Sequence, residues 1–164
     1  MSKLLKSLIS SLLVVGSMQV AQAADLSEAQ AREAIKPFYD AFTIAPDRDA
    51  EKLVLAGTAD NWESCSADDV CKPRVEAAKT IGGFGKAIPD LKWEIKEVVV
   101  SGNRVVVRGE GSGTPAVDFM GVPHSGKSFK LMSIDIHHIE NGKIAGKTYH
   151  LEDWAGALQQ LSAK

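Results

Sequence analysis

The sequence predicts one α+β domain, in which three helices pack on one face of a strongly curved, mostly antiparallel sheet. Helix caps and helix-like spacing of apolar residues occupy residues 27–86. Alternating apolar and polar residues, separated by turn residues, occupy residues 91–154. Helices grouped before strands favour an α+β layer arrangement over alternating parallel units.

Residues 1–23 are interpreted as a secretory signal peptide. Two lysines precede an apolar run at residues 4–15, and Ala21-Gln22-Ala23 has the small-x-small pattern of a cleavage site. The run is shorter than the roughly 20 apolar residues that span a membrane. We therefore expect residues 24–164 to form a single exported domain, periplasmic or secreted, that begins at Ala24. The alternative is an uncleaved membrane anchor.

The charge argues against some classes of partner. The formal net charge is −2, and cleavage would remove two lysines. A mildly acidic domain without basic clusters argues against nucleic acid. No segment after the leader is apolar over the length of a membrane span, so no stable membrane insertion is expected after cleavage.

Two cysteines, Cys65 and Cys71, lie close together in the sequence. In an oxidising compartment such a pair predicts a disulfide, and a zinc site would need a second pair of ligands. The closed loop is short, so its entropic contribution is about 2 kcal/mol.

Three helices are expected first. Ser27 and Gln30 form a capping box for the first helix, and Pro37 predicts a kink or break within it. The second helix occupies residues 49–57 and the third residues 73–86.

Strands and loops follow. A change of phase at Glu97 predicts a bulge, the device that bends a sheet. The glycine-rich residues 111–126 are expected to form a loop with a brief edge strand, able to fold over a pocket mouth. A short helix is expected at residues 157–161.

The last two strands meet at Asn141-Gly142, a strong hairpin signal that leaves two registers open. With a two-residue type I′ turn, Asp135 lines up with Thr148 and His150. With a three-residue loop at residues 140–142, in which Gly142 is left-handed, the register changes by one residue and every side chain changes face.

The three-residue loop is the preferred interpretation. It places Asp135, His137, Tyr149 and Asp153 on one face above apolar residues, which is the usual composition of a small-molecule pocket. It leaves an apolar outer face that predicts a homodimer, formed by Met132, Ile134, Ile136 and Ile144.

Four stretches carry a resemblance to a known family: residues 88–91, 119–127, 134–136 and 140–144. They resemble the SnoaL-like polyketide cyclases, also called ester cyclases, of the nuclear transport factor 2-like superfamily. The resemblance covers nearly the whole chain after the leader. It implies a cone-shaped α+β barrel around a hydrophobic pocket, commonly in a dimer. The usual Pro-Thr-Gly of the family loop is His-Ser-Gly at residues 124–126.

The resemblance also implies roles for two aspartates. Asp153 is similar to the family's acid/base on the last strand, and Asp135 to the aspartate that hydrogen-bonds an enolate in related steroid isomerases. Burial in an apolar pocket is expected to raise the pKa of such carboxylates, which lets them exchange protons near neutral pH. Asp153 would remove a proton beside a carbonyl, and Asp135 or His137 would stabilise the oxygen. The alternative for Asp153 is an exposed helix cap.

We therefore expect an exported, cofactor-independent cyclase, isomerase or lyase that acts on a small hydrophobic or carbonyl-containing molecule. Its expected catalytic residues are Asp153, Asp135 and His137, and its expected substrate-binding residues are Tyr39, Trp62, Phe119 and Tyr149. No cofactor or metal is expected. His137 and His138 point to opposite sides of a strand and cannot both bind one ion, and the alternative is a metal site formed by Asp135, His137 and Asp153. The alternative function is a non-catalytic periplasmic binding protein for a small hydrophobic ligand.

Overall fold

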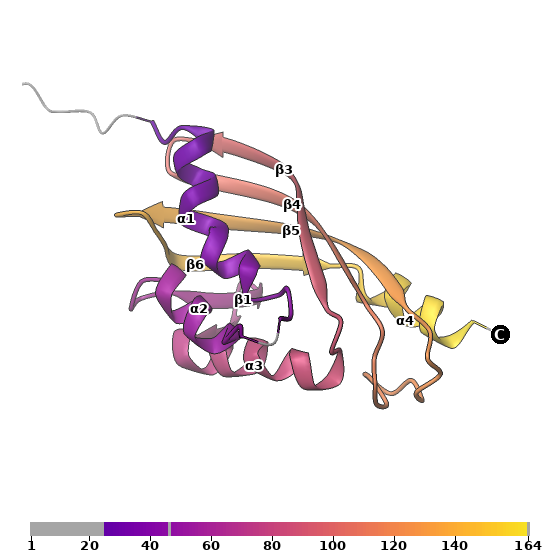
Figure 1. The fold of residues 1–164 in the computed structure, drawn as a ribbon. Helices are drawn as coiled ribbons and strands as arrows, with labels where there is room; N and C mark the ends of the chain where they lie inside the picture. Colours follow the sequence, from indigo (N-terminus) through magenta and orange to yellow (C-terminus); the bar gives the residue numbers. More distant parts are fainter. Residues whose placement is uncertain (1–24, 46, 164) are drawn as a thin grey trace, which may run out of the picture.

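The computed structural model describes residues 25–45 and 47–163 (Figure 1). The predicted signal peptide and the predicted first residue, Ala24, lie outside the described residues and stay predictions. Within the described part of the chain, the elements are α1 (Glu28–Asp40), α2 (Ala50–Gly57), β1 (Glu63–Ala67), β2 (Val70–Pro73), α3 (Arg74–Ala87), β3 (Lys92–Ser101), β4 (Arg104–Gly113), β5 (Phe129–Glu140), β6 (Lys143–Glu152) and α4 (Trp154–Ser162).

The six strands form one mixed, open sheet in the order β2-β1-β6-β5-β4-β3. Helices α1 to α3 cover one face of it, and α4 lies at one end (Figure 1). The α+β class is therefore confirmed. The hairpin β1–β2 was not predicted, and β1 pairs with β6 in parallel, while the other pairs are antiparallel.

The helices begin where their caps predict. Ser27 and Gln30 form the predicted capping box, and Asp49 accepts a hydrogen bond from the Lys52 amide at the start of α2. The predicted break at Pro37 is wrong, because α1 continues to Asp40 with its apolar side in the core. None of the helices described is both long and apolar enough to cross a membrane.

The predicted bulge is confirmed: the register of β3 against β4 shifts between Ile95 and Glu97. The predicted disulfide is confirmed as well. Cys65 and Cys71 lie directly opposite each other in the β1–β2 hairpin and are joined by a disulfide. Because Cys65 is fully buried, the bond ties the edge strand β2 to a buried residue of β1.

The turn between β5 and β6 has two residues, so the preferred three-residue loop is wrong. Glu140 pairs with Lys143, and both Asn141 (φ 50°) and Gly142 (φ 72°) are left-handed. This is the conformation that a type I′ hairpin turn requires, and Asn and Gly are the residues that adopt it at least cost.

A second irregularity lies further along β6. His138 pairs with Ala145, but Ile136 pairs with Tyr149, so three residues of β6 lie opposite His137 alone. Gly146, at φ 58°, supplies the left-handed residue that this bulge contains. Beyond the bulge, Asp135 lies opposite His150.

The register moves several predicted residues to other faces. Tyr149 lies opposite Ile136, whose side chain is on the exposed face, so Tyr149 is not inside. Ile144 is fully buried, contrary to its predicted place on the outer face. The exposed apolar side chains of the outer face are instead Val99, Met132, Ile136 and Leu151.

Candidate functional site

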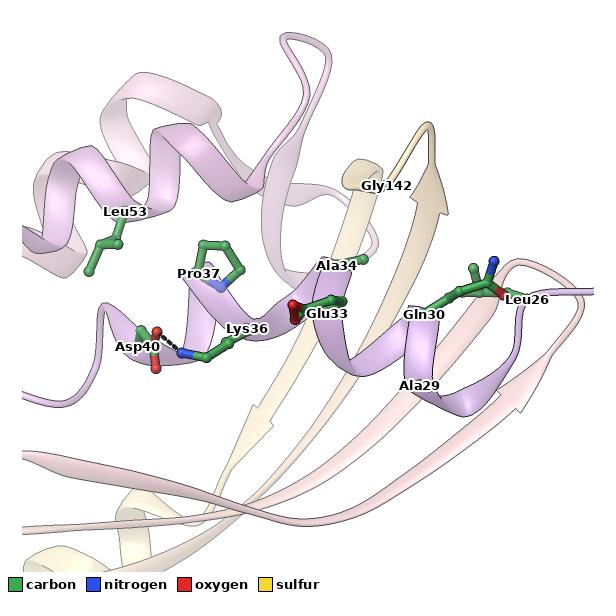
Figure 2. A pocket seen from close by; sticks show the side chains of 10 residues that line it. All are labelled: Leu26, Ala29, Gln30, Glu33, Ala34, Lys36, Pro37, Asp40, Leu53 and Gly142. Atoms are coloured by element: carbon green, nitrogen blue, oxygen red, sulfur yellow. Dashed lines mark hydrogen bonds and ion pairs between the residues drawn. The ribbon is translucent and has the colours of Figure 1, made fainter.

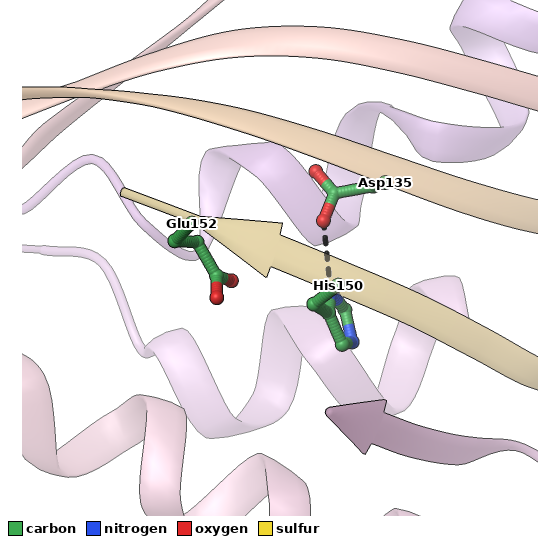
Figure 3. Close-up of side chains that lie close together, drawn as sticks. All are labelled: Asp135, His150 and Glu152. Atoms are coloured by element: carbon green, nitrogen blue, oxygen red, sulfur yellow. Dashed lines mark hydrogen bonds and ion pairs between the residues drawn. The ribbon is translucent and has the colours of Figure 1, made fainter. Parts of the chain in front are cut away.

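A buried carboxylate and an imidazole form the centre of the site. Asp135 on β5 and His150 on β6 face each other, and Asp135 Oδ1 accepts a hydrogen bond from His150 Nδ1 at 2.8 Å (Figure 3). The Asp135 side chain is 4% exposed, whereas the His150 side chain is 12% exposed. His150 therefore stands between the carboxylate and the solvent.

A chain of hydrogen bonds leads to the other oxygen of Asp135. The distances are 2.8 Å from Trp62 Nε1 to Thr148 Oγ1, 3.1 Å from Thr148 Oγ1 to His137 Nδ1, 2.9 Å from His137 Nε2 to the Tyr39 hydroxyl, and 2.7 Å from that hydroxyl to Asp135 Oδ2. The described residues contain no buried polar side-chain atom without a partner.

The direction of every bond in this chain follows from its two ends. An indole N–H can only donate, and an ionised carboxylate can only accept. Thr148 therefore accepts from Trp62 and donates to His137 Nδ1. His137 carries its proton on Nε2 and donates to Tyr39, whose own proton goes to Asp135. The chain thus delivers a second donor to the carboxylate.

The pKa values agree with this assignment. Complete burial lowers the pKa of His137 to about 4, only partly offset by the charge of Asp135, so His137 is neutral. Burial and the negative Asp135 raise the pKa of Tyr39 well above its ordinary value. Burial alone would raise the pKa of Asp135, but the hydrogen bond from His150, the electrostatic interactions with His137 and His150 and the hydrogen bond from Tyr39 outweigh it, and the pKa is lowered.

The expectation that Asp135 has a raised pKa is therefore wrong: Asp135 is the anion of the site. The carboxylate with a raised pKa is Glu152, two residues after His150 on the same face of β6 (Figure 3). Burial is the main cause, and the charge of Asp135 adds to it, although His150 acts in the opposite direction. A carboxyl group that holds its proton can donate a hydrogen bond to a ligand.

His150 and Glu152 open into a cavity of about 200 Å³ between the sheet and α3. Its apolar wall consists of Phe42, Val70, Ala77, Ile81 and Phe84, and its polar lining consists of Ser64, Ser66, Lys72, Thr80, His150 and Glu152. Pockets for drug-sized ligands are typically about 300–1,000 Å³, so this cavity suits a smaller molecule.

Ser64 on β1 brings a hydroxyl to the free side of His150. Its Oγ lies 3.0 Å from His150 Nε2. Phe38 packs on the imidazole from the core, with the two rings nearly parallel and their centroids 6.1 Å apart. The imidazole is therefore held by an apolar ring, a carboxylate and a hydroxyl.

Three side chains could together contact a cation. Asp135, His150 and Glu152 each offer one ligand atom, and these atoms lie within 4.8 Å of one another. The hydrogen bond to Asp135 uses Nδ1 of His150, so a cation on that nitrogen would have to displace the proton. The arrangement fits proton transfer better than metal binding.

The predicted site residues divide into two groups. Asp135, His137, Tyr39 and Trp62 come together, although His137 and Trp62 are almost fully buried and act through hydrogen bonds. Asp153, Tyr149 and Phe119 lie elsewhere. The prediction that Asp153 shares the cavity face is wrong, since its exposed carboxylate caps α4 by accepting a hydrogen bond from the Gly156 amide at 2.9 Å.

Phe119 packs instead against Trp154 in a second apolar cluster next to α4, with ring centroids 5.6 Å apart. The preferred sequence interpretation missed three site residues: His150, Glu152 and Ser64. The two-residue turn, had it been preferred, would have identified His150. No motif singles out Glu152 or Ser64.

A wider hollow of about 810 Å³ lies outside this site (Figure 2). It is lined by Leu26, by residues of α1 between Ala29 and Asp40, by Leu53 of α2 and by Gly142 at the tip of the last hairpin. Its charged side chains include the paired Lys36 and Asp40 (Figure 2). None of its lining residues belongs to the buried network around Asp135.

Comparisons with known proteins find solved structures that have a similar fold. TsrD from Streptomyces laurentii is 23% identical, with a TM-score of 0.71 over 85% of this chain and 100% of its own. A SnoaL-like polyketide cyclase from Agrobacterium tumefaciens strain C58 is 20% identical, with a TM-score of 0.62 over 78% of this chain and 94% of its own. An LEH-like epoxide hydrolase from M. tuberculosis is 11% identical, with a TM-score of 0.61 over 81% of this chain and 90% of its own.

Because these sequence identities are low, the similarity to the solved structures shows a shared fold and nothing more. A search among curated protein sequences gave no match. The family model of the SnoaL-like polyketide cyclases matches residues 38–161, which include the cavity, the last hairpin and most of α4. The chain therefore belongs to the SnoaL-like polyketide cyclase family.

Proposed function

We propose that this chain is an exported enzyme that catalyses cofactor-free proton transfer on a small carbonyl compound, in a reaction of the cyclase, isomerase or lyase type. The observation that carries the proposal is the Asp135–His150 pair at 2.8 Å, which opens into a small cavity with an apolar wall. Membership of the family supports small-molecule chemistry of this type.

His150 is the proton acceptor in this proposal. Because its Nδ1 proton is held by Asp135, the lone pair of neutral His150 is on Nε2, on the cavity side. A carbon acid bound in the cavity would take the place of the Ser64 hydroxyl and give its proton to Nε2. Asp135 would then stabilise the imidazolium, since the opposite charges lie in hydrogen-bonding contact.

Glu152 supplies the complementary acid. The carbonyl oxygen of the substrate gains negative charge as the proton leaves, and Glu152, whose pKa is raised, can donate to it whenever the carboxyl group carries its proton. Two groups on one strand thus take the two roles of acid/base catalysis: His150 is the base, and Glu152, whose pKa burial raises, is the acid. Asp153, the acid/base that family resemblance suggests, has no part in this assignment.

The proposal is tested with two probes that fit a small cavity: cyclohexanone in deuterium oxide and a β,γ-unsaturated cyclic ketone. We expect α-carbon deuterium exchange or conjugation of the double bond to proceed faster than in buffer. His150→Asn keeps a donor toward Asp135 but has no base at the Nε2 position, so the rate should fall roughly 100-fold or more.

His138→Asn is the matched control, because His138 contacts Asn103 and Glu140 away from the cavity. Equal rates for wild type and His150→Asn would overturn the assignment. Ligand-induced stabilisation by both ketones without exchange or isomerisation would favour the non-catalytic binding protein.

We further propose a homodimer that associates through the outer face of the sheet. Four apolar side chains on this face are exposed: Val99 (53%), Met132 (55%), Ile136 (38%) and Leu151 (72%). A group of exposed apolar side chains on one sheet face is typical of an interaction surface.

A further inference from the structure

The imidazole of His150 also contacts a side chain of the protein that could act as a nucleophile. Ser64 Oγ lies 3.0 Å from His150 Nε2, and His150 Nδ1 lies 2.8 Å from Asp135 Oδ1. The three groups stand in the order hydroxyl, imidazole, carboxylate, and both distances are in hydrogen-bonding range.

The proton positions in this arrangement follow from the carboxylate. Asp135 accepts from Tyr39 and from His150, so neutral His150 carries its proton on Nδ1. Nε2 therefore accepts, and the Ser64 hydroxyl donates to it. These are the roles of nucleophile, general base and orienting group in serine-dependent acyl transfer, a constellation recognised by geometry and not by fold.

The surroundings of Ser64 favour its action as a nucleophile in acyl transfer. Ser64 lies half-buried at the cavity, directly opposite Lys72 in the β1–β2 pair. Lys72 Nζ donates to Thr80 Oγ1 at 3.3 Å, which places a positive charge on the same cavity. A cation near the nucleophile can stabilise the oxyanion that forms when a carbonyl is attacked.

We propose that Ser64 is a nucleophile that accepts the acyl group of small carboxylic esters. Ser64 Oγ would form a bond to the carbonyl carbon while its proton passes to His150 Nε2. The carbon–oxygen bond to the alcohol then breaks, and the alcohol leaves with that proton. Water, deprotonated by the same nitrogen, would release the carboxylic acid and restore Ser64. The apolar wall of the cavity selects short, uncharged acyl groups.

This activity goes beyond the proton transfer proposed above and is tested separately. The probes are p-nitrophenyl acetate and a short alkyl fluorophosphonate, with intact-mass measurement and peptide mapping. We expect one adduct per chain, on Ser64, and a burst of p-nitrophenol from the acetate. Ser64→Ala should abolish the adduct. Ser101→Ala is the matched control, because Ser101 lies at the end of β3 and does not line the cavity.

His150→Asn should slow acylation of Ser64 roughly 100-fold or more, because the general base is lost. An adduct on Ser66 or Lys72, an adduct that persists in Ser64→Ala, or no adduct on the wild-type protein would overturn the proposal. Deuterium exchange of cyclohexanone by the wild-type protein is measured in parallel, since this reaction depends on His150 and needs no adduct on Ser64. Failure of the acyl transfer and failure of the proton transfer are therefore distinguishable.

Discussion

Asp135 lies directly opposite His150 in the β5–β6 pair, and its second oxygen receives the Tyr39 hydroxyl at 2.7 Å. The carboxylate is thus held by donors from a strand and from a helix. We expect Asp135→Asn to leave one of these donors facing an amide N–H. The free energy of unfolding should fall by about 1–3 kcal/mol, the cost of a buried group without a partner.

The same variant should also lose proton transfer, because His150 no longer has an anion to set its tautomer. Urea unfolding and the exchange of cyclohexanone protons measure the two effects on one sample. A variant that kept the full exchange rate would show that the carboxylate has only a structural role.

Asp153 provides the contrasting case. Asp153→Ala removes the side-chain cap of α4 and should lower the free energy of unfolding by about 1 kcal/mol. Asp153→Asn should restore most of it, since Asn also caps helices well. We expect the exchange rate of both variants to equal that of wild type. A large loss of exchange in Asp153→Asn would return Asp153 to the catalytic role that the family resemblance implies.

The burial of His137 predicts a dependence of stability on pH. Its pKa is about 4 in the folded chain and near 6.5 when unfolded, so between these values the unfolded chain binds the proton more strongly. Stability should therefore fall as the pH falls from 6.5 toward 4, by at most about 1.4 kcal/mol per pH unit from this group. Glu152, with its raised pKa, acts in the opposite direction above pH 4.5.

Urea unfolding of wild type and His137→Gln between pH 4 and 7 isolates the histidine. Glutamine can still accept from Thr148 and donate to Tyr39, but it does not titrate. The slope of stability against pH should be smaller in the variant. An unchanged slope would mean that His137 does not titrate differently in the two states.

Removal of the disulfide measures how much it stabilises the edge hairpin β1–β2. The loop-closure contribution predicts a loss of about 2 kcal/mol for a Cys65→Ala/Cys71→Ala variant, with additional loss from the buried Cys65 side chain. Deuterium exchange by His150 should persist, whereas labelling of Ser64, the neighbour of Cys65, should slow. Thiol titration of unfolded, unreduced wild type should find no free cysteine.

A substitution on the outer face of the sheet tests whether the protein forms the proposed dimer. Leu151→Lys places a charge in the centre of the proposed interface and should convert the protein to a monomer in light scattering at micromolar concentration. Val75→Lys, at an exposed apolar position on α3, is the matched control. A wild-type protein that is already monomeric would contradict the dimer.

Much of the fold was predictable because local signals determine it. The capping residues Ser27 and Asp49 mark where α1 and α2 begin, and the phase change at Glu97 marks the bulge of β3. The hairpin β1–β2 was not predicted, since its residues are mostly polar and largely exposed, without the alternation of a half-buried strand.

The site was less predictable, because its register depends on two irregularities. The burial of Asp135 and His137 follows from the alternation along β5. Which residue of β6 faces them depends on the turn at Asn141-Gly142 and on the bulge at Gly146. Ser64 reaches His150 only through the parallel pairing of β1 with β6, a contact between segments far apart in the chain.

The bulge in β6 has a consequence for how the family's chemistry can diversify. If the same chain paired regularly from His138 and Ala145, with no bulge, Thr148 and not His150 would lie opposite Asp135. Because the bulge shifts the register by an even number of residues, it changes the partner of Asp135 without turning the strand over. A change around Gly146, a position that does not line the cavity, could remove the bulge without altering the length of the chain, and it would then exchange an imidazole for a hydroxyl beside the same carboxylate.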